Sequence, residues 1–261
     1  MALRQTATIY KDTQFIKYII FLFYIFASMK KFIYTLPLLL LLNLPTNIKA
    51  QTDPDEMGAW YMYILSTQFK KDSLWGFQGD IQHRNYNLIG DLQQLLIRGG
   101  FTYMPKESPL KLTLGYAYIS IGTYGDSDEK TAEHRFYQET SFPIKLAKGV
   151  FSTHRFRYEM RYIEDQDFRT RYRYAIFLNI PLNRPLIEPK TFYLSLYDEV
   201  FINGQRRIGM GKSVSFFDHN RLYGALGYVF KKGFKMQFGM MRLTSNKFGK
   251  NQLQLSLHHT F

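Results

Sequence analysis

The sequence contains no cysteine, so neither a disulfide framework nor a thiolate metal site can form. It also lacks a glycine-rich loop followed by a helix, the phosphate-binding element of many nucleotide-dependent proteins. Beyond the first fifty residues, no stretch keeps the periodicity of an amphipathic helix over three turns. These absences exclude a disulfide-stapled domain, a P-loop enzyme and a helical bundle.

Groups able to carry catalysis or bind a metal are few and dispersed. Adjacent His258 and His259 point to opposite faces of a strand and make a poor chelator. Ser256 with His258 is the one serine–histidine pair expected inside, and spacing of two residues on a strand is a weak signal. The acidic pair Asp198 and Glu199 is better explained as structural. We therefore expect no catalytic residue, no metal site and no cofactor.

Aromatic residues are abundant, with 20 Tyr and 23 Phe among 261 residues. Aromatic girdles at the two interfaces of a bilayer use such residues, although a soluble β-sandwich also buries many of them. The formal net charge is +13, of which the first fifty residues carry +5 (six basic residues against one acidic), leaving +8. These charges alternate with aromatics and form no basic run, so we do not expect nucleic-acid binding.

The N-terminus has the features of an export signal. Residues 29–50 begin with Met-Lys-Lys, continue with a short apolar core and end on Ala50, which predicts a signal peptide cut after that residue. Residues 1–28 contain a second apolar run of about thirteen residues, interrupted by Lys17. Because a transmembrane helix needs roughly 20 apolar residues, we interpret 1–28 as a misassigned N-terminal extension in preference to a membrane helix. Residues 51–261 are then the mature protein.

The final stretch shows the pattern of the mature chain most clearly. Three segments of about ten residues alternate apolar with polar or small residues, and they are separated by turns at 231–233 and 246–250. The chain then ends on Phe261. Alternating segments joined by turns, with an aromatic at the end, are typical of membrane-spanning β-barrels. We predict that Phe261 is an assembly signal read by the barrel-assembly machinery.

The same unit repeats along the body, which predicts an all-β fold: an antiparallel transmembrane β-barrel of about 10–12 strands. Eleven alternating runs are present, near 57–67, 73–86, 92–104, 110–121, 132–142, 150–163, 168–181, 190–202, 218–231, 233–244 and 251–261. A barrel with both termini in the periplasm needs an even number of strands. We therefore expect that the first run is not a full span, or that one run has been missed or split.

Several runs have one polar and one aromatic face. A charged side chain facing lipid at mid-bilayer costs roughly 2–4 kcal/mol, so the polar faces should point into the lumen. Two interpretations remain open: a salt-bridged interior filled by side chains, which we favour, and an arginine-rich conduit or anion site. The residues predicted to line the lumen are Arg135, Glu139, Arg155, Arg157, Glu159, Arg161, Arg169, Arg171, Arg173, Glu199 and Arg221. Glu199 is expected to pair with a lumen arginine such as Arg221.

An ordered set of short stretches resembles a known family. It comprises Trp60 at the first strand, then Glu133-His134-Arg135-Phe136, Arg155-Phe156-Arg157-Tyr158-Glu159, Arg171-Tyr172-Arg173, 194–201 (LSLYDEVF) and 220–228 (NRLYGALGY). In this order the set resembles the domain-of-unknown-function 2490 family of predicted outer-membrane proteins from Gram-negative bacteria. The resemblance covers nearly all of 51–261 and implies a β-barrel in the outer membrane. It implies no activity, because the family has no assigned one.

The sequence therefore predicts an exported outer-membrane β-barrel of Gram-negative bacteria, structural or forming a narrow pore, with a charged Arg/Glu/Tyr-lined interior. Its expected partners are outer-membrane lipids and the barrel-assembly machinery. Two alternatives remain: a barrel enzyme acting on lipid or envelope substrates, and a soluble periplasmic β-protein with the apolar faces inside.

Overall fold

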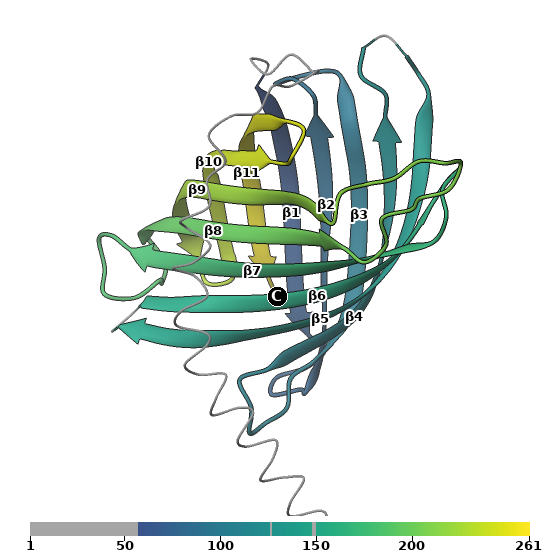
Figure 1. The fold of residues 1–261 in the computed structure, drawn as a ribbon. Coiled ribbons are helices and arrows are strands. Elements are labelled where there is room, and N and C mark those ends of the chain that lie inside the picture. The colour runs from purple at the N-terminus through teal and green to yellow at the C-terminus, as the bar shows by residue number, and fades with distance from the viewer. Residues whose placement is uncertain (1–56, 126, 148–149) are drawn as a thin grey trace, which may run out of the picture. The chain divides into compact units, whose positions relative to one another are not determined.

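The computed structural model describes residues 57–125, 127–147 and 150–261. This part of the chain forms eleven strands that close into a barrel (Figure 1). The strands are β1 (Gly58–Gln68), β2 (Trp75–Asn85), β3 (Leu92–Tyr103), β4 (Lys111–Gly122), β5 (Lys130–Ala147), β6 (Val150–Ile163), β7 (Arg169–Pro181), β8 (Phe192–Asn203), β9 (Phe217–Lys231), β10 (Phe234–Thr244) and β11 (Gly249–Thr260). The predicted all-β barrel and its strand number are confirmed. The expected signal peptide and N-terminal extension lie outside the described residues.

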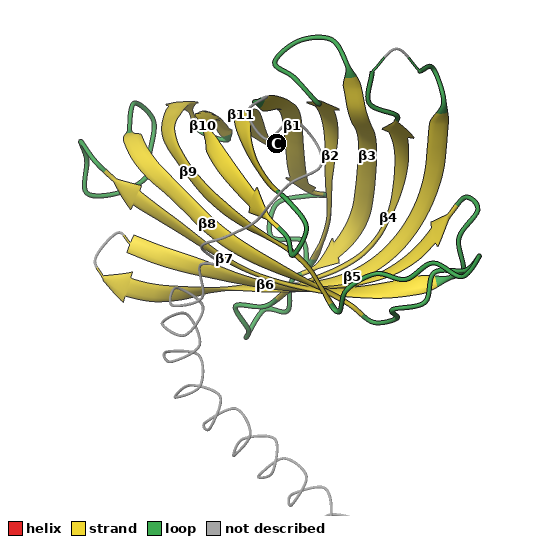
Figure 2. Ribbon diagram, turned by 45° about the horizontal axis from the view of Figure 1, so that its top comes forward, coloured by secondary structure: helices red, strands yellow, loops and turns green. Residues whose placement is uncertain are grey.

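No helix among the described residues has the length and apolar content required to span a membrane. The strands and the loops between them are shown in Figure 2.

Each strand pairs antiparallel with the next in sequence, and the barrel is closed by a parallel pairing of β1 with β11. This seam extends from the Gly58–Gln252 pair to the Ser66–Thr260 pair. The expectation of an even count was therefore wrong: no run is missing or split, and the first is a full strand. An odd number of strands closes because β1 and β11 run in the same direction, so Gly58 and Phe261 lie at opposite ends of the barrel.

The side-chain period of two sets which residues face inward. On β5, Glu133, Arg135, Tyr137 and Glu139 are buried inside the barrel, while the residues between them, such as Phe136, are exposed outside. Other strands follow the same rule. The inside of the barrel is thus charged and aromatic, and the outside is largely apolar.

Two tyrosines pack flat across the inner wall onto glycines of neighbouring strands. Tyr137 lies opposite Gly115 and Tyr193 lies opposite Gly227 in the strand register. A Cβ added at either glycine would meet the facing tyrosine Cζ at 2.2 Å, so only glycine fits beneath the rings. This arrangement fills the wall without breaking the ladder.

The loops separate into two sets. Short turns such as 232–233, where Gly233 has a φ of 77°, lie at the end that carries Phe261. The longest loop, 204–216, lies at the opposite end together with the turn between β10 and β11, whereas the loop 182–191 lies at the Phe261 end. The loop 204–216 is ordered by an Arg207–Ser213 bridge and by a hydrogen bond from the Asp167 amide to the Ile208 carbonyl (3.0 Å). We refer to these as the short-turn end and the long-loop end.

Candidate functional site: the barrel lumen

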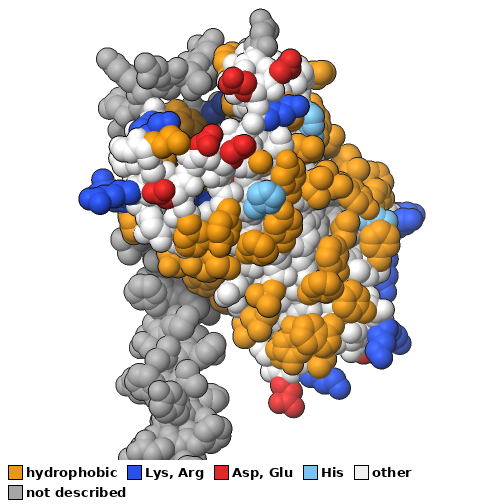
Figure 3. Space-filling model, turned by 90° about the vertical axis from the view of Figure 1, so that its right-hand side faces the viewer, with side chains coloured by type: hydrophobic (Ala, Val, Ile, Leu, Met, Phe, Trp, Pro, Cys, Tyr) orange, Lys and Arg blue, Asp and Glu red, His pale blue; other side chains and the backbone are white. Residues whose placement is uncertain are grey.

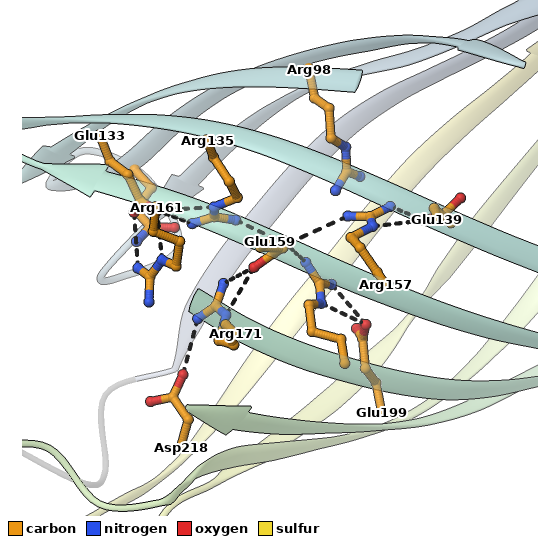
Figure 4. A network of polar contacts seen from close by, with 12 residues as sticks. Arg98, Glu133, Arg135, Glu139, Arg157, Glu159, Arg161, Arg171, Glu199 and Asp218 are labelled. Atoms are coloured by element: carbon orange, nitrogen blue, oxygen red, sulfur yellow. Dashed lines mark hydrogen bonds and ion pairs between the residues drawn. The ribbon is translucent and has the colours of Figure 1, made fainter. Parts of the chain in front are cut away.

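The interior of the barrel contains a network of ion pairs centred on Glu159 of β6. Its carboxylate is completely buried and lies within 2.6 Å of Arg173 Nη1, 2.8 Å of Arg171 Nη2 and 3.5 Å of Arg135 Nη1. Arg157 is a fourth cation, at 3.9 Å. Figure 4 shows the side chains of Arg135 of β5, Arg157 of β6 and Arg171 of β7 converging on Glu159. Glu159 therefore holds together arginines that would otherwise repel one another.

Three further glutamates extend the network across the inner wall. Glu133 pairs with Arg135 and Arg161, and Glu139 pairs with Arg155 and Arg157. Glu199 of β8 binds Arg155 at 2.6 Å and Arg173 at 2.7 Å. Each carboxylate bridges two or more guanidinium groups, so the inner wall formed by β5–β8 is a continuous electrostatic lattice (Figure 4).

Nine of the eleven residues expected to line the lumen belong to this lattice: Arg135, Glu139, Arg155, Arg157, Glu159, Arg161, Arg171, Arg173 and Glu199. Arg169 and Arg221 have no carboxylate within ion-pair distance among the described residues. Glu199 lies opposite Arg221 in the register but pairs with Arg155 and Arg173 instead. Both neighbours bond to the same carboxylate oxygen, Oε1.

Two acidic members of the lattice were not among the predicted residues. Glu133 lies on the same inward face of β5 as Arg135, the polar face that the alternation already assigned to the lumen. Asp218 pairs with Arg171 at 3.0 Å, although it stands at the start of β9 where the pairing with β8 shifts register. Because of this shift in register, simple alternation along β9 does not predict that Asp218 contacts the lattice.

Beside the lattice, the lumen encloses a cavity of about 650 Å³. Its lining includes Arg84 and His219 near the long-loop end, and Lys111, Lys235 and His258 near the short-turn end, so it follows much of the length of the strands. Ten lining residues are basic and one, Glu199, is acidic. The basic residues are Arg84, Arg98, Lys111, Arg135, Arg155, Arg161, Arg171, Arg173, Arg221 and Lys235. The expectation of a largely filled interior therefore applies to the β5–β8 side and not to the space beside it.

Trp60 of β1 forms part of the cavity wall. The guanidinium carbon of Arg84 lies 3.8 Å from the centre of the Trp60 ring, and that of Arg221 lies 4.8 Å from it. Trp60 also packs against Tyr223, Ala225 and Met241 in a buried cluster. The tryptophan thus brings two arginines from distant strands to the same place.

Two serine–histidine contacts occur on the strands. The Ser256 hydroxyl lies 3.0 Å from His258 Nε2 on the inward face of β11, as the sequence suggested. A second contact, missed from the sequence, joins Ser152 Oγ to His154 Nε2 at 3.1 Å on the outward face of β6. His154 Nδ1 is also 2.7 Å from the Tyr174 hydroxyl on β7. Both serine and histidine of this second group are buried beneath neighbouring side chains.

The remaining features concern the ends. Phe261 donates its backbone N–H to the Ser66 carbonyl at 3.0 Å, and its ring lies 3.9 Å from that of His259. In the loop after β2, burial and the nearby Asp91 raise the pKa of Tyr86. The hydroxyl of Tyr86 donates to the Gly122 carbonyl at 3.1 Å.

No group of three or more potential metal ligands lies together in the part of the chain that the structure describes.

Comparison with known proteins identifies one relationship. The sequence profile of a family described as "Protein of unknown function (DUF2490)" matches residues 57–254, which covers nearly the whole barrel. No curated protein and no solved structure matches the chain.

Proposed function

We propose, from the premise that the chain belongs to the DUF2490 family, that it spans the outer membrane of a Gram-negative bacterium and forms a narrow aqueous pore. The observation that carries the proposal is the inverted polarity of the barrel. Large apolar side chains such as Phe101, Leu114, Phe136 and Phe238 are exposed on the outside, while arginines and glutamates are buried inside. A barrel in water would have the opposite arrangement.

The distribution of side chains over the outer surface supports this membrane location. On the face shown in Figure 3, hydrophobic side chains cover the middle, and charged side chains lie towards the margins. Soluble monomers rarely expose contiguous apolar patches larger than a few hundred Å². Lipid contact would bury these side chains, whereas the inward charges would avoid the roughly 2–4 kcal/mol that a charge costs in the middle of the bilayer.

The pore part of the proposal follows from the cavity. One enclosed water needs about 10–15 Å³, so a cavity of about 650 Å³ has room for a chain of many waters. Its lining comes from both halves of the strands, which suits a passage running along the barrel. The lattice on β5–β8 occupies the other side of the lumen and keeps this passage narrow. Only ions and small solutes would fit beside it.

Export and assembly belong to the same proposal. Cleavage after Ala50 would release a mature chain beginning at Gln51. Phe261, adjoining the outward-facing leucines Leu253, Leu255 and Leu257 of β11, would be recognised by the barrel-assembly machinery. Mass spectrometry of the protein purified from membranes tests this step, and an intact residue 29–50 segment would contradict it.

Fractionation and conductance test the proposal directly. The full chain, expressed in a Gram-negative host, should appear in the outer-membrane fraction, require detergent for extraction and migrate faster on gels before heating. Purified protein should produce small, uniform conductance steps in planar lipid bilayers. Extraction without detergent would favour the soluble periplasmic alternative, and a membrane-inserted barrel without conductance would overturn the pore.

The second candidate function is hydrolysis of envelope lipids, and one observation favours it. Ser152, His154 and Tyr174 form a hydrogen-bonded series on the outward face, where a lipid substrate would be available. A serine activated by a histidine, itself oriented by a third group, is the general arrangement of a nucleophilic hydrolase. However, Ser152 is only 4% exposed, and the Phe142 ring stacks on His154 at 5.4 Å. Substrate access would require Phe142 to move.

An activity measurement separates the two candidates. Purified protein in mixed micelles would be assayed for release of fatty acid from phospholipid, with Ser152→Ala compared with Ser256→Ala as the matched control. We expect no turnover in any of the three proteins. Turnover lost only in Ser152→Ala would establish the hydrolase in place of a purely pore-forming role.

A further inference from the structure

Two arginines of the lumen are held in place without a carboxylate, unlike most of their neighbours. Arg84 of β2 and Arg221 of β9 both line the cavity and both contact Trp60. We propose that they form a binding station for an oxyanion, the phosphate or carboxylate group of a small solute, and make the passage selective for anions. The selectivity rests on the proposed pore, whereas binding at the station does not.

Arg84 is positioned by neutral groups. Its Nε and Nη2 donate to Gln82 Oε1 at 3.0 and 2.5 Å, and its Nη1 donates to Gln94 Oε1 at 2.7 Å. Its side chain is also 7% exposed and stacked on Trp60. By contrast, Arg98 on the next strand binds the carboxylate of Asp80 at 2.5 Å. The two glutamines orient the Arg84 guanidinium without forming an ion pair with it. The nearest carboxylate, that of Asp80, accepts a hydrogen bond from Gln82 at 2.6 Å and is paired with Arg98.

Arg221 is held between two aromatic rings. Its guanidinium carbon lies 4.8 Å from the centre of the Trp60 ring and 4.5 Å from that of Phe201. Its Nε is buried and has no hydrogen-bond partner among the described residues, and the same holds for Trp60 Nε1. Native proteins rarely leave such donors unsatisfied. Arg221 lines the cavity and forms no ion pair among the described residues, so an anion in the cavity would supply the missing counter-charge.

The surroundings favour an anion over any other ligand. Glu199, the single acidic residue of the cavity lining, is already bound by Arg155 and Arg173. Lys111 and Lys235 face the cavity near the short-turn end with no carboxylate in ion-pair distance among the described residues. Because a narrow, low-dielectric passage focuses the field of its lining, anions would be concentrated along it. Guanidinium groups match the planar or tetrahedral oxygens of carboxylate and phosphate.

The cavity volume also suits a small solute. About 650 Å³ lies within the range of about 300–1,000 Å³ that small-molecule sites occupy. The aromatic ring of Trp60 gives such a solute an apolar surface next to the two charges. The station is therefore suited to a small organic acid or phosphate ester as well as to the inorganic ion.

Tryptophan fluorescence tests the binding directly. The chain has two tryptophans, and Trp75 is exposed on the outside, so a Trp75→Phe protein in detergent reports on Trp60 alone. Titration with inorganic phosphate and, separately, with acetate should change the Trp60 emission saturably, and the two affinities show which oxyanion is preferred. Choline chloride at matched ionic strength should cause no saturable change.

Three variants make the binding test specific. Arg84→Gln and Arg221→Gln should each raise the apparent Kd about tenfold or more, since each removes a charged donor. Gln94→Glu should do the same while keeping both arginines, because it supplies the missing carboxylate next to Arg84. Arg242→Gln, which removes an exposed cation bonded to Asn251, is the matched control and should leave the Kd unchanged. Heat-modifiable gel mobility verifies that each variant is folded.

Saturable oxyanion binding that these folded variants leave unaltered would overturn the station, as would the absence of any saturable change. Reversal potentials in a KCl gradient test the selectivity: the wild type should favour chloride, and Gln94→Glu should shift the potential towards cations. A conducting channel with cation selectivity would overturn the inferred selectivity alone. A protein that binds phosphate but never conducts would overturn the proposed pore and leave the station standing.

Discussion

Glu159→Gln should be the most destabilising of the conservative substitutions in the lumen. The change preserves the shape of the side chain but removes the negative charge that four arginines share, two of them at 2.6 and 2.8 Å. Because the Glu159 side chain is fully buried, salt in the bulk solution screens its interactions little. Removing one partner of a buried ion pair typically costs about 3–5 kcal/mol. We expect a loss in this range in the free energy of unfolding, measured by urea titration of the folded fraction in lipid vesicles.

The matched control is Glu188→Gln in the loop between β7 and β8. Glu188 pairs with Arg184 at 3.1 Å, but the two side chains are 45% and 41% exposed. An exposed pair of this kind contributes at most about 1 kcal/mol, so the control should change the unfolding free energy little. If both variants lose the same amount, or if Glu159→Gln loses less than about 1 kcal/mol, the lattice does not stabilise the barrel as argued.

Three further outcomes are expected. Gly227→Ala should cost about 1–3 kcal/mol, because its Cβ would meet Tyr193 at 2.2 Å, whereas Gly224→Ala, whose nearest contact is 3.5 Å, serves as control in the same urea titration. Equal losses would refute the packing argument. Phe238→Arg, on the outward face of β10, should cost about 2–4 kcal/mol in lipid vesicles; a change within about 0.5 kcal/mol, usual for a water-exposed site, would argue against the membrane location. Deleting Phe261 should lower the folded fraction in outer-membrane preparations, and undiminished insertion would contradict its role as an assembly signal.

The barrel could be predicted because strand alternation is a local property of the sequence. β6 occupies the predicted residues 150–163, and the other strands lie within a few residues of their runs in most cases. β5 is an exception, since it continues through Pro143 to Ala147. Beyond Ser141 this strand is paired with β6 alone, so the missing N–H of Pro143 breaks no ladder on the β4 side. A proline in a strand therefore marks a one-sided edge here, not the end of the strand.

The contacts inside the lumen could not be predicted to the same degree, because they depend on the register between strands. Trp60 and Arg84 meet only because β1 and β2 pair them directly. His154 and Tyr174 contact each other diagonally across β6 and β7. The alternation identified the charged inward faces. The partners of Glu199, Arg155 and Arg173, depend on how the side chains of β6, β7 and β8 pack together in the lumen.

The parallel seam between β1 and β11 constrains how such a barrel can be rearranged or enlarged. Nine residue pairs at about 3.3 Å per residue separate the start of β1 from the end of β11 by roughly 30 Å. A circular permutant joining Phe261 to Gly58 would need a linker of about nine or more extended residues, where a hairpin needs two. Duplicating any hairpin adds two strands, so the first strand would still begin at the end of the barrel opposite to the one where the last strand stops. Only the gain or loss of a single strand would place the start of the first strand and the end of the last strand at the same end of the barrel.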